Sequence, residues 1–253
     1  MIESYRENGY LLIRNFLSDN EIGELRTILN EFHRLWQQEN AEFYQQQAVN
    51  SAYLTRNEFL NSEQRERLFQ FIGSEKVMAV VKALLPKQPC FLNTQLFFNP
   101  VNKKQTNYWH RDPQYHLSIE QQQAALASFD VMHLRLPLLD EPGIELVPGT
   151  HKRWDSTEEL QVRLEQDGHK NNQSLAQGKV IKLFAGDLLV FSANMIHRGL
   201  YGMDRLALDI LFCPPEPSVI EFVREDCLPN NDILAEIEDN SAFVNTIKLK
   251  ALN

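Results

Sequence analysis

Residues 187–213 read DLLVFSANMIHRGLYGMDRLALDILFC, and this stretch contains two β-rich runs joined by a short turn that includes glycine. The first run, DLLVFS, leads to His197, and the second, RLALDILF, begins at Arg205. Runs of this length that are rich in branched and aromatic residues, with turn residues between them, are typical of antiparallel strands. The stretch therefore predicts one strand that delivers a histidine and a return strand that begins with an arginine.

The same sequence pattern extends over residues 90–213, where short β-rich runs alternate with Pro, Gly, Asn and Asp turns. No helical pattern alternates with these runs, which favours a jelly-roll or cupin-like barrel over a doubly wound parallel sheet. We expect a mainly β fold with flanking helices, built on a double-stranded β-helix. The further runs are FLNTQLFFN, SFDVMHLRLPLL, GIELVP and KVIKLF.

The beginning of the chain has a different pattern. Residues 9–17 predict a short buried strand, and Ser18 with Glu21 forms a Ser-x-x-Glu capping box that predicts a helix reaching roughly residue 40. Ser74 is expected to cap a second helix, which Pro86 ends.

These patterns predict one domain over residues 1–253. Residues 1–89 would form a mainly helical support, residues 90–213 the β-helix core, and residues 214–253 turns and short helices.

Composition limits the classes of partner. A formal charge of −9 without a Lys/Arg-rich run argues against a nucleic-acid or anionic-membrane surface, because such partners are bound by basic patches. Three scattered cysteines are too few for a disulfide framework or a thiolate zinc site. No signal peptide or membrane-spanning stretch is apparent. We expect a cytoplasmic protein, monomeric or homodimeric, that acts on a small molecule.

A candidate metal site lies in the segment NYWHRDP at residues 107–113. On an extended chain His110 and Asp112 point the same way, and His197 could supply a third ligand. Two histidines and one carboxylate on one face of an octahedral iron leave three positions open, as an oxygen-activating iron requires. The alternative for His110 and Asp112 is a hydrogen-bonded pair on the surface of a strand.

Arg205 is a candidate for binding a carboxylate. It opens the strand that follows His197, and its planar guanidinium suits bidentate pairing with a carboxylate group. Ala207, on the same face, is small enough to leave room. The alternative is a strand-end ion pair with Asp204 or Asp209.

Four segments in order resemble the phytanoyl-CoA dioxygenase family of iron(II)- and 2-oxoglutarate-dependent oxygenases, and the resemblance covers most of the chain. The segments are ENGYLLIRNFLSDNEIGELR, WHRD, GIELVPGTH and GDLLVFSANMIHRG followed by Arg205.

The resemblance implies that His110, Asp112 and His197 bind iron(II) and that Arg205 pairs with the 5-carboxylate of 2-oxoglutarate. Relatives also place polar groups that help to hold 2-oxoglutarate on the strand carrying Asn93 and Gln95, for which a ladder or turn role is the alternative.

The sequence departs from the family pattern at two points. Arg111 stands between the metal ligands where many members have glutamine, and the interval from His197 to Arg205 is shorter than in many members. By the same resemblance, the retained Asp112 favours oxygen insertion over halogenation.

Other roles stay open at this level. His133 and Arg135 share one face of a strand and could look into the barrel, where an inward Arg135 would indicate an anionic substrate; an outward salt bridge is the alternative. The polar segment 152–178 could be a lid over the substrate or a surface helix.

The sequence thus predicts a 2-oxoglutarate-dependent dioxygenase that hydroxylates a small metabolite. Two alternatives remain: a non-catalytic cupin-like binding protein, and a mononuclear metal enzyme that does not use 2-oxoglutarate.

Overall fold

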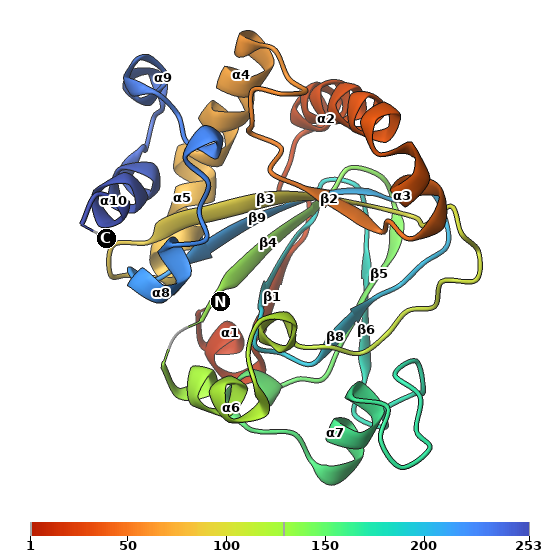
Figure 1. The fold of residues 1–253 in the computed structure, drawn as a ribbon. Helices are drawn as coiled ribbons and strands as arrows, with labels where there is room; N and C mark the ends of the chain where they lie inside the picture. The colour runs from red at the N-terminus through yellow and green to blue at the C-terminus, as the bar shows by residue number, and fades with distance from the viewer. Residues whose placement is uncertain (1, 129, 253) are drawn as a thin grey trace.

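A computed structural model describes residues 2–128 and 130–252. Two antiparallel sheets form its centre: a six-stranded sheet in the order β1-β7-β4-β9-β3-β2 and a three-stranded sheet in the order β6-β5-β8 (Figure 1). This arrangement confirms the expected double-stranded β-helix. The strands are β1 (Tyr10–Ile13), β2 (Asn50–Ala52), β3 (Cys90–Phe98), β4 (Met132–Pro137), β5 (Glu141–Leu146), β6 (Lys179–Leu183), β7 (Leu188–Ser192), β8 (His197–Gly199) and β9 (Leu206–Cys213).

Helices cover one face of the large sheet and close the ends of the barrel. Figure 1 shows α2 and α4 above strands β3, β9 and β4, with α6 and α7 below them. The helices are α1 (Ile2–Asn8), α2 (Asp19–Glu39), α3 (Ala41–Gln46), α4 (Ser62–Ile72), α5 (Glu75–Leu84), α6 (Ile119–Ser128), α7 (Thr157–Arg163), α8 (Pro217–Ile220), α9 (Asn231–Glu236) and α10 (Ser241–Lys250), with 3-10 turns η1 (Asp112–Tyr115), η2 (Thr150–Lys152) and η3 (Glu225–Cys227).

The two helix starts predicted at Ser18 and Ser74 are both present in the structure. The Ser18 side chain accepts a hydrogen bond from the Glu21 amide, and the Glu21 side chain accepts one from the Ser18 amide, so α2 begins with the predicted capping box. Ser74 is the N-cap of α5, but its side chain makes no capping hydrogen bond.

The first 89 residues are more than a helical support. Strand β1 pairs with β7 and strand β2 pairs with β3, so both belong to the large sheet. The sequence predicts a β-rich run over residues 128–139, SFDVMHLRLPLL. Residue 129 of this run lies outside the described residues.

Side chains alternate between the two faces of the large sheet, and this alternation separates the core from the site. Leu96, Leu134 and Leu208 are fully buried in the hydrophobic cluster that includes the apolar faces of α2, α4 and α5. Their neighbours on the opposite face line a cavity between the sheets instead. The register aligns Gln95, Asp209 and Arg135 in one row across β3, β9 and β4, and Asn93, Leu211 and His133 in the next row. The polar inner face is therefore a product of strand pairing.

Among the described residues, no helix combines the length and apolar character that crossing a bilayer would require.

Candidate metal centre and adjoining arginine site

Backbone pairing brings the predicted metal ligands together from distant parts of the chain. His110 and His197 exchange two backbone hydrogen bonds, of 3.0 and 2.9 Å, and the amide of Asp112 donates to the carbonyl of Ala193 at 3.1 Å. His197 begins β8, whereas Asp112 begins the 3-10 turn η1 rather than continuing a strand. Arg111 between the two ligands is extended, so His110 and Asp112 still project to the same side.

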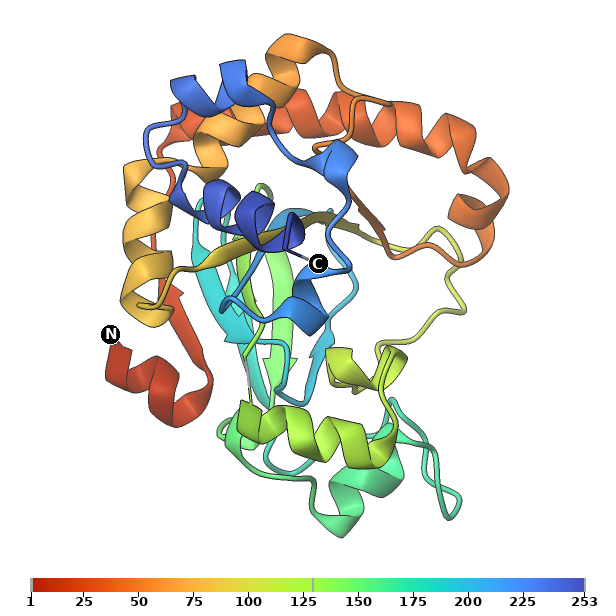
Figure 2. The ribbon, with the colours of Figure 1, turned by 60° about the vertical axis from the view of Figure 1, so that its left-hand side comes forward.

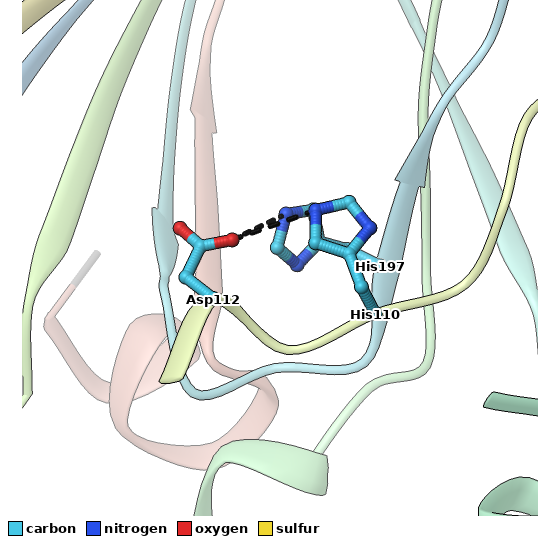
Figure 3. Close-up of side chains that lie close together, drawn as sticks. All are labelled: His110, Asp112 and His197. Carbon is cyan, nitrogen blue, oxygen red and sulfur yellow. Dashed lines mark ion pairs between the residues drawn. The ribbon is translucent and has the colours of Figure 1, made fainter. Parts of the chain in front are cut away.

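The three side chains converge on one point (Figure 3). Nε2 of His110 and Nε2 of His197 each lie 3.5 Å from Oδ1 of Asp112, and all three ligand atoms lie within 4.8 Å of one another. Ligands held about 2.1 Å from one ion at right angles would lie about 3 Å apart. The spacing therefore suits a single octahedral metal ion.

Both imidazoles are oriented for metal binding. Nδ1 of His110 donates to the carbonyl of Tyr108 at 3.1 Å, and Nδ1 of His197 donates to the carbonyl of Met195 at 3.0 Å. With the proton on Nδ1, the lone pair of Nε2 faces Asp112. Burial and the neighbouring His110 lower the pKa of His197 to about 3, so this ring is neutral, as a ligand must be.

Asp112 is ionised and held at both oxygens. Burial alone would raise its pKa, but the adjacent His110 and His133 keep the pKa well below its usual value. Oδ2 accepts a 2.7 Å hydrogen bond from Nε2 of His133, which leaves Oδ1 facing the two other ligands. The side chain of His133 therefore points into the barrel, which is one of the two orientations predicted from the sequence.

Arg135 also points inward, and it is part of a buried charged cluster. Its Nε donates to Glu141 at 3.0 Å and its Nη1 to Asp209 at 3.2 Å. The other oxygen of Glu141 accepts from Nε of Arg205 at 3.2 Å. All four side chains are almost fully buried, with Glu141 and Asp209 at 0% exposure. One carboxylate thus holds two guanidinium groups side by side. Because Arg135 is already paired with Glu141 and Asp209, its inward position does not by itself indicate an anionic substrate.

The sequence allowed an ion pair with Asp204 or Asp209 as the alternative role of Arg205, and the structure shows a different partner. The ion pair of Arg205 is made with Glu141 of β5, and not with Asp204 or Asp209. Burial and the adjacent Arg135 lower its pKa to about 10, so it remains cationic at neutral pH. Gly199 makes room for it, because a Cβ at this position would lie 2.8 Å from Nη2 of Arg205.

Asn93 and Gln95 both line the cavity that contains the candidate metal ligands and Arg205. The carbonyl oxygen of the Asn93 side chain accepts a hydrogen bond from the amide of Thr94 at 2.8 Å, which occupies its acceptor and leaves the NH₂ group as its remaining donor. The two side chains are half-buried and lie on the same face of β3 as Phe97.

Arg111 takes no part in the cavity. Its guanidinium donates to Asp155 at 2.7 Å and to the carbonyl of Thr150 at 2.7 Å, and Arg163 donates to the other oxygen of Asp155 at 2.7 Å. Arg111 therefore ties the turn that carries His110 and Asp112 to the far side of the loop that follows β5. Its buried partners were not apparent in the sequence, because the ion pair joins residues 44 positions apart.

Segment 152–178 supports the same turn from behind. The amide of Trp109 donates to the carbonyl of Asn171 at 2.8 Å, and its indole donates to the carbonyl of Gln173 at 2.7 Å. Within the described part of the chain, no residue of this segment lines the cavity. The geometry favours the surface-helix alternative over a lid.

Comparisons with known proteins agree with this geometry. The sequence model of the phytanoyl-CoA dioxygenase (PhyH) family matches residues 5–200. No curated protein matches the sequence.

Solved structures with the same fold were found. HygX from Streptomyces hygroscopicus, crystallised with nickel and 2-oxoglutarate, is 14% identical with a TM-score of 0.61 over 84% of this chain and 85% of its own. EctD from S. alaskensis, with 2-oxoglutarate and 5-hydroxyectoine, is 12% identical with a TM-score of 0.59 over 84% and 74%. SnoK from nogalamycin biosynthesis, a non-heme alpha ketoglutarate dependent carbocyclase, is 15% identical with a TM-score of 0.57 over 85% and 83%.

Proposed function

Because the chain belongs to the phytanoyl-CoA dioxygenase family, we propose that it is an iron(II)- and 2-oxoglutarate-dependent oxygenase that hydroxylates a small molecule. The observation that carries the proposal is the convergence of His110, Asp112 and His197 in the cavity that also contains Arg205. A metal-binding protein without turnover has no need of three open coordination positions beside a buried carboxylate-binding arginine. HygX and EctD, which share the fold, bind 2-oxoglutarate in their crystals.

The residues of this chain have distinct tasks in the proposal. His110, Asp112 and His197 hold the iron on one face, and Arg205 binds the 5-carboxylate of 2-oxoglutarate by charge-assisted hydrogen bonds. Asn93 and Gln95 offer amide groups to the co-substrate or substrate from the wall of the cavity. When bound, iron(II) supplies dioxygen activation coupled to conversion of 2-oxoglutarate into succinate and carbon dioxide.

The overall reaction inserts one oxygen atom of O₂ into a substrate C–H bond and the other into succinate. The protein contributes by excluding water and by fixing the substrate relative to the metal. Asp112 occupies the carboxylate position of the triad, which favours hydroxylation over halogenation. SnoK is described as a carbocyclase, so the product has to be identified by its mass.

Anaerobic reconstitution with iron(II) and 2-oxoglutarate tests the proposal. We expect a visible iron–2-oxoglutarate charge-transfer absorption that is absent in Asp112→Ala, and slow release of succinate when oxygen is admitted. Metal binding without the absorption band would favour a metal enzyme that does not use 2-oxoglutarate. A band without succinate, even with candidate substrates present, would favour the non-catalytic binding protein.

A further inference from the structure

The cavity is much larger than the co-substrate alone requires. Its volume is about 880 Å³, in the upper part of the range of about 300–1,000 Å³ that is typical of small-molecule sites. 2-Oxoglutarate has a five-carbon skeleton, so most of this space is left for a second molecule.

The two ends of the cavity differ in chemistry. Strand β9 runs from the polar end, next to Arg205, past Asp209 to Leu211. Around Leu211 the lining becomes mainly apolar, with Gln121, Ser128 and Ser218 as polar exceptions, and we call this end the apolar chamber. Its lining comes from β3, β9, the segment after η1, α6, the residue before β4, and α8 with the residues that follow. The chamber is defined by Leu92, Leu117, Ala124, Ala125, Val131, Leu211, Val219 and Phe222.

The charges of the cavity are concentrated away from the chamber. The two arginines that line the cavity, Arg135 and Arg205, share Glu141 at the polar end. Among the described lining residues there is no lysine and no other arginine, and His133 is already paired with Asp112 and Asp209. Glu221, next to Phe222, is an exposed acidic side chain of the lining. An anion placed here would lose hydration without gaining a cationic partner.

Aromatic side chains stand at the rim of the chamber. Phe222 is 62% exposed, and the ring of His116 stacks on it with centroids 6.0 Å apart. Both helices near this rim, α6 and α8, lie on the same side of the large sheet (Figures 1 and 2). Large apolar side chains left in water around a pocket are typical of a place where an apolar ligand enters.

We propose that the apolar chamber binds the primary substrate, and that this substrate is an uncharged, mainly apolar small molecule that carries a ring system. The NH₂ group of Asn93, at the boundary between the two ends, can orient a hydroxyl or carbonyl oxygen of that molecule. A free carboxylate placed in the chamber would meet no lysine or arginine among the described lining residues there. The inference rests on the proposed function only in assigning the polar end to 2-oxoglutarate.

Two fluorescent probes with the same ring system test the charge of the chamber. N-phenyl-1-naphthylamine is neutral, and 1-anilinonaphthalene-8-sulfonate adds one sulfonate. We expect the neutral probe to bind at least about ten-fold more tightly, with enhanced fluorescence, because the sulfonate would be desolvated without a partner. Equal or tighter binding of the sulfonate would overturn the proposal.

Variants locate the binding site. Val219→Trp should fill the chamber and weaken the neutral probe at least about five-fold, whereas Val180→Trp, at an exposed position of β6 outside the cavity, should not. Glu221→Lys should strengthen binding of the sulfonate probe several-fold, whereas Glu225→Lys, which is exposed and does not line the cavity, should not. If Val219→Trp fails to fold, the pair of glutamate variants still decides the question. If Glu221→Lys prefers the neutral probe over the sulfonate probe as strongly as the parent protein does, the proposal is contradicted.

The test separates this inference from the proposed function. The probes are titrated against the nickel-loaded protein without 2-oxoglutarate and again with 2-oxoglutarate present. Displacement of the neutral probe by 2-oxoglutarate would place it at the polar end and overturn the proposal. Binding of the neutral probe to the chamber in a protein that does not bind 2-oxoglutarate would leave the chamber assigned and refute the co-substrate instead.

Discussion

Nε2 of His133 lies 2.7 Å from Oδ2 of Asp112, and the other ring nitrogen of His133 lies 3.2 Å from Asp209. The imidazole is therefore clamped between two carboxylates and stacks on Phe191 with centroids 4.7 Å apart. Burial alone would lower the pKa of His133, but Asp112 and Asp209 raise it to about 9, so the ring donates to both carboxylates. This contact turns Oδ1 of Asp112 toward His110 and His197.

His133→Asn should weaken metal binding about 10–100-fold, because Asp112 loses the hydrogen bond that orients it. Titration of the metal-free protein with nickel(II), followed by calorimetry, measures the effect without turnover. His169→Asn, in the segment behind the metal-binding turn, is the control. Unchanged nickel affinity in a folded His133→Asn protein would show that Asp112 needs no orientation.

Arg205→Met should weaken 2-oxoglutarate binding at least about 100-fold and leave nickel affinity within about three-fold, because charge-assisted hydrogen bonds to a buried carboxylate contribute roughly 1.5–3 kcal/mol each. Equilibrium titration of the nickel-loaded protein with 2-oxoglutarate gives both values. Arg198→Met is the matched control, since Arg198 is also a largely buried arginine but pairs with Glu145 and does not line the cavity. Equal losses in the two variants would argue against a specific role of Arg205.

Gly199→Ala should weaken 2-oxoglutarate binding by about ten-fold while the protein remains folded. The added methyl group would lie 2.8 Å from Nη2 of Arg205 and would push the guanidinium out of its place. The control is Gly23→Ala in α2, where no atom lies within 4 Å of the new methyl group. That exchange should raise the free energy of unfolding by up to about 1 kcal/mol, since alanine is the better helix former.

Glu141→Gln should lower the free energy of unfolding by about 3–5 kcal/mol, because it leaves Arg135 and Arg205 close together without their shared carboxylate. Added 2-oxoglutarate should raise the thermal midpoint more in this variant than in the parent protein, since its carboxylate replaces part of the lost negative charge. Glu145→Gln, which breaks the Arg198 pair outside the cavity, is expected to show no such extra recovery. Thermal unfolding with and without 2-oxoglutarate compares the two.

His33→Phe should reduce the loss of stability in mild acid. Burial lowers the pKa of His33 to about 4, and its ring lies 4.4 Å from that of Phe98. As the pH falls from about 6.5 to about 4, the unfolded chain binds a proton that the folded chain rejects, so stability is lost in this window. The pKa difference sets an upper limit of about 3 kcal/mol on the stability that is lost. The partial exposure of His33 reduces the expected loss to about 1–2 kcal/mol. Urea unfolding at pH 7.0 and 4.5 measures it, with His169→Phe as control; an identical pH dependence in His33→Phe and the parent would refute the assignment.

Local sequence was sufficient for features that depend on neighbours along the chain. The capping box at Ser18 and Glu21 and the alternation that puts His110 and Asp112 on one side of the chain involve residues two or three positions apart. Such relationships follow from backbone geometry alone. The three proposed metal ligands and Arg205 could therefore be selected from motifs and their order.

Tertiary structure decided which charged groups share the interior. Glu141 lies between two arginines, and His133 lies against Asp112, because the strands that carry them pair in one particular register. The period of two along a strand gives the face of each side chain but not its neighbour on the next strand, and a shift of one residue would turn every side chain to the other face. The joining of β1 and β2 to the large sheet was hidden for the same reason. Sequence thus specified the reactive groups, and pairing between distant strands specified their partners.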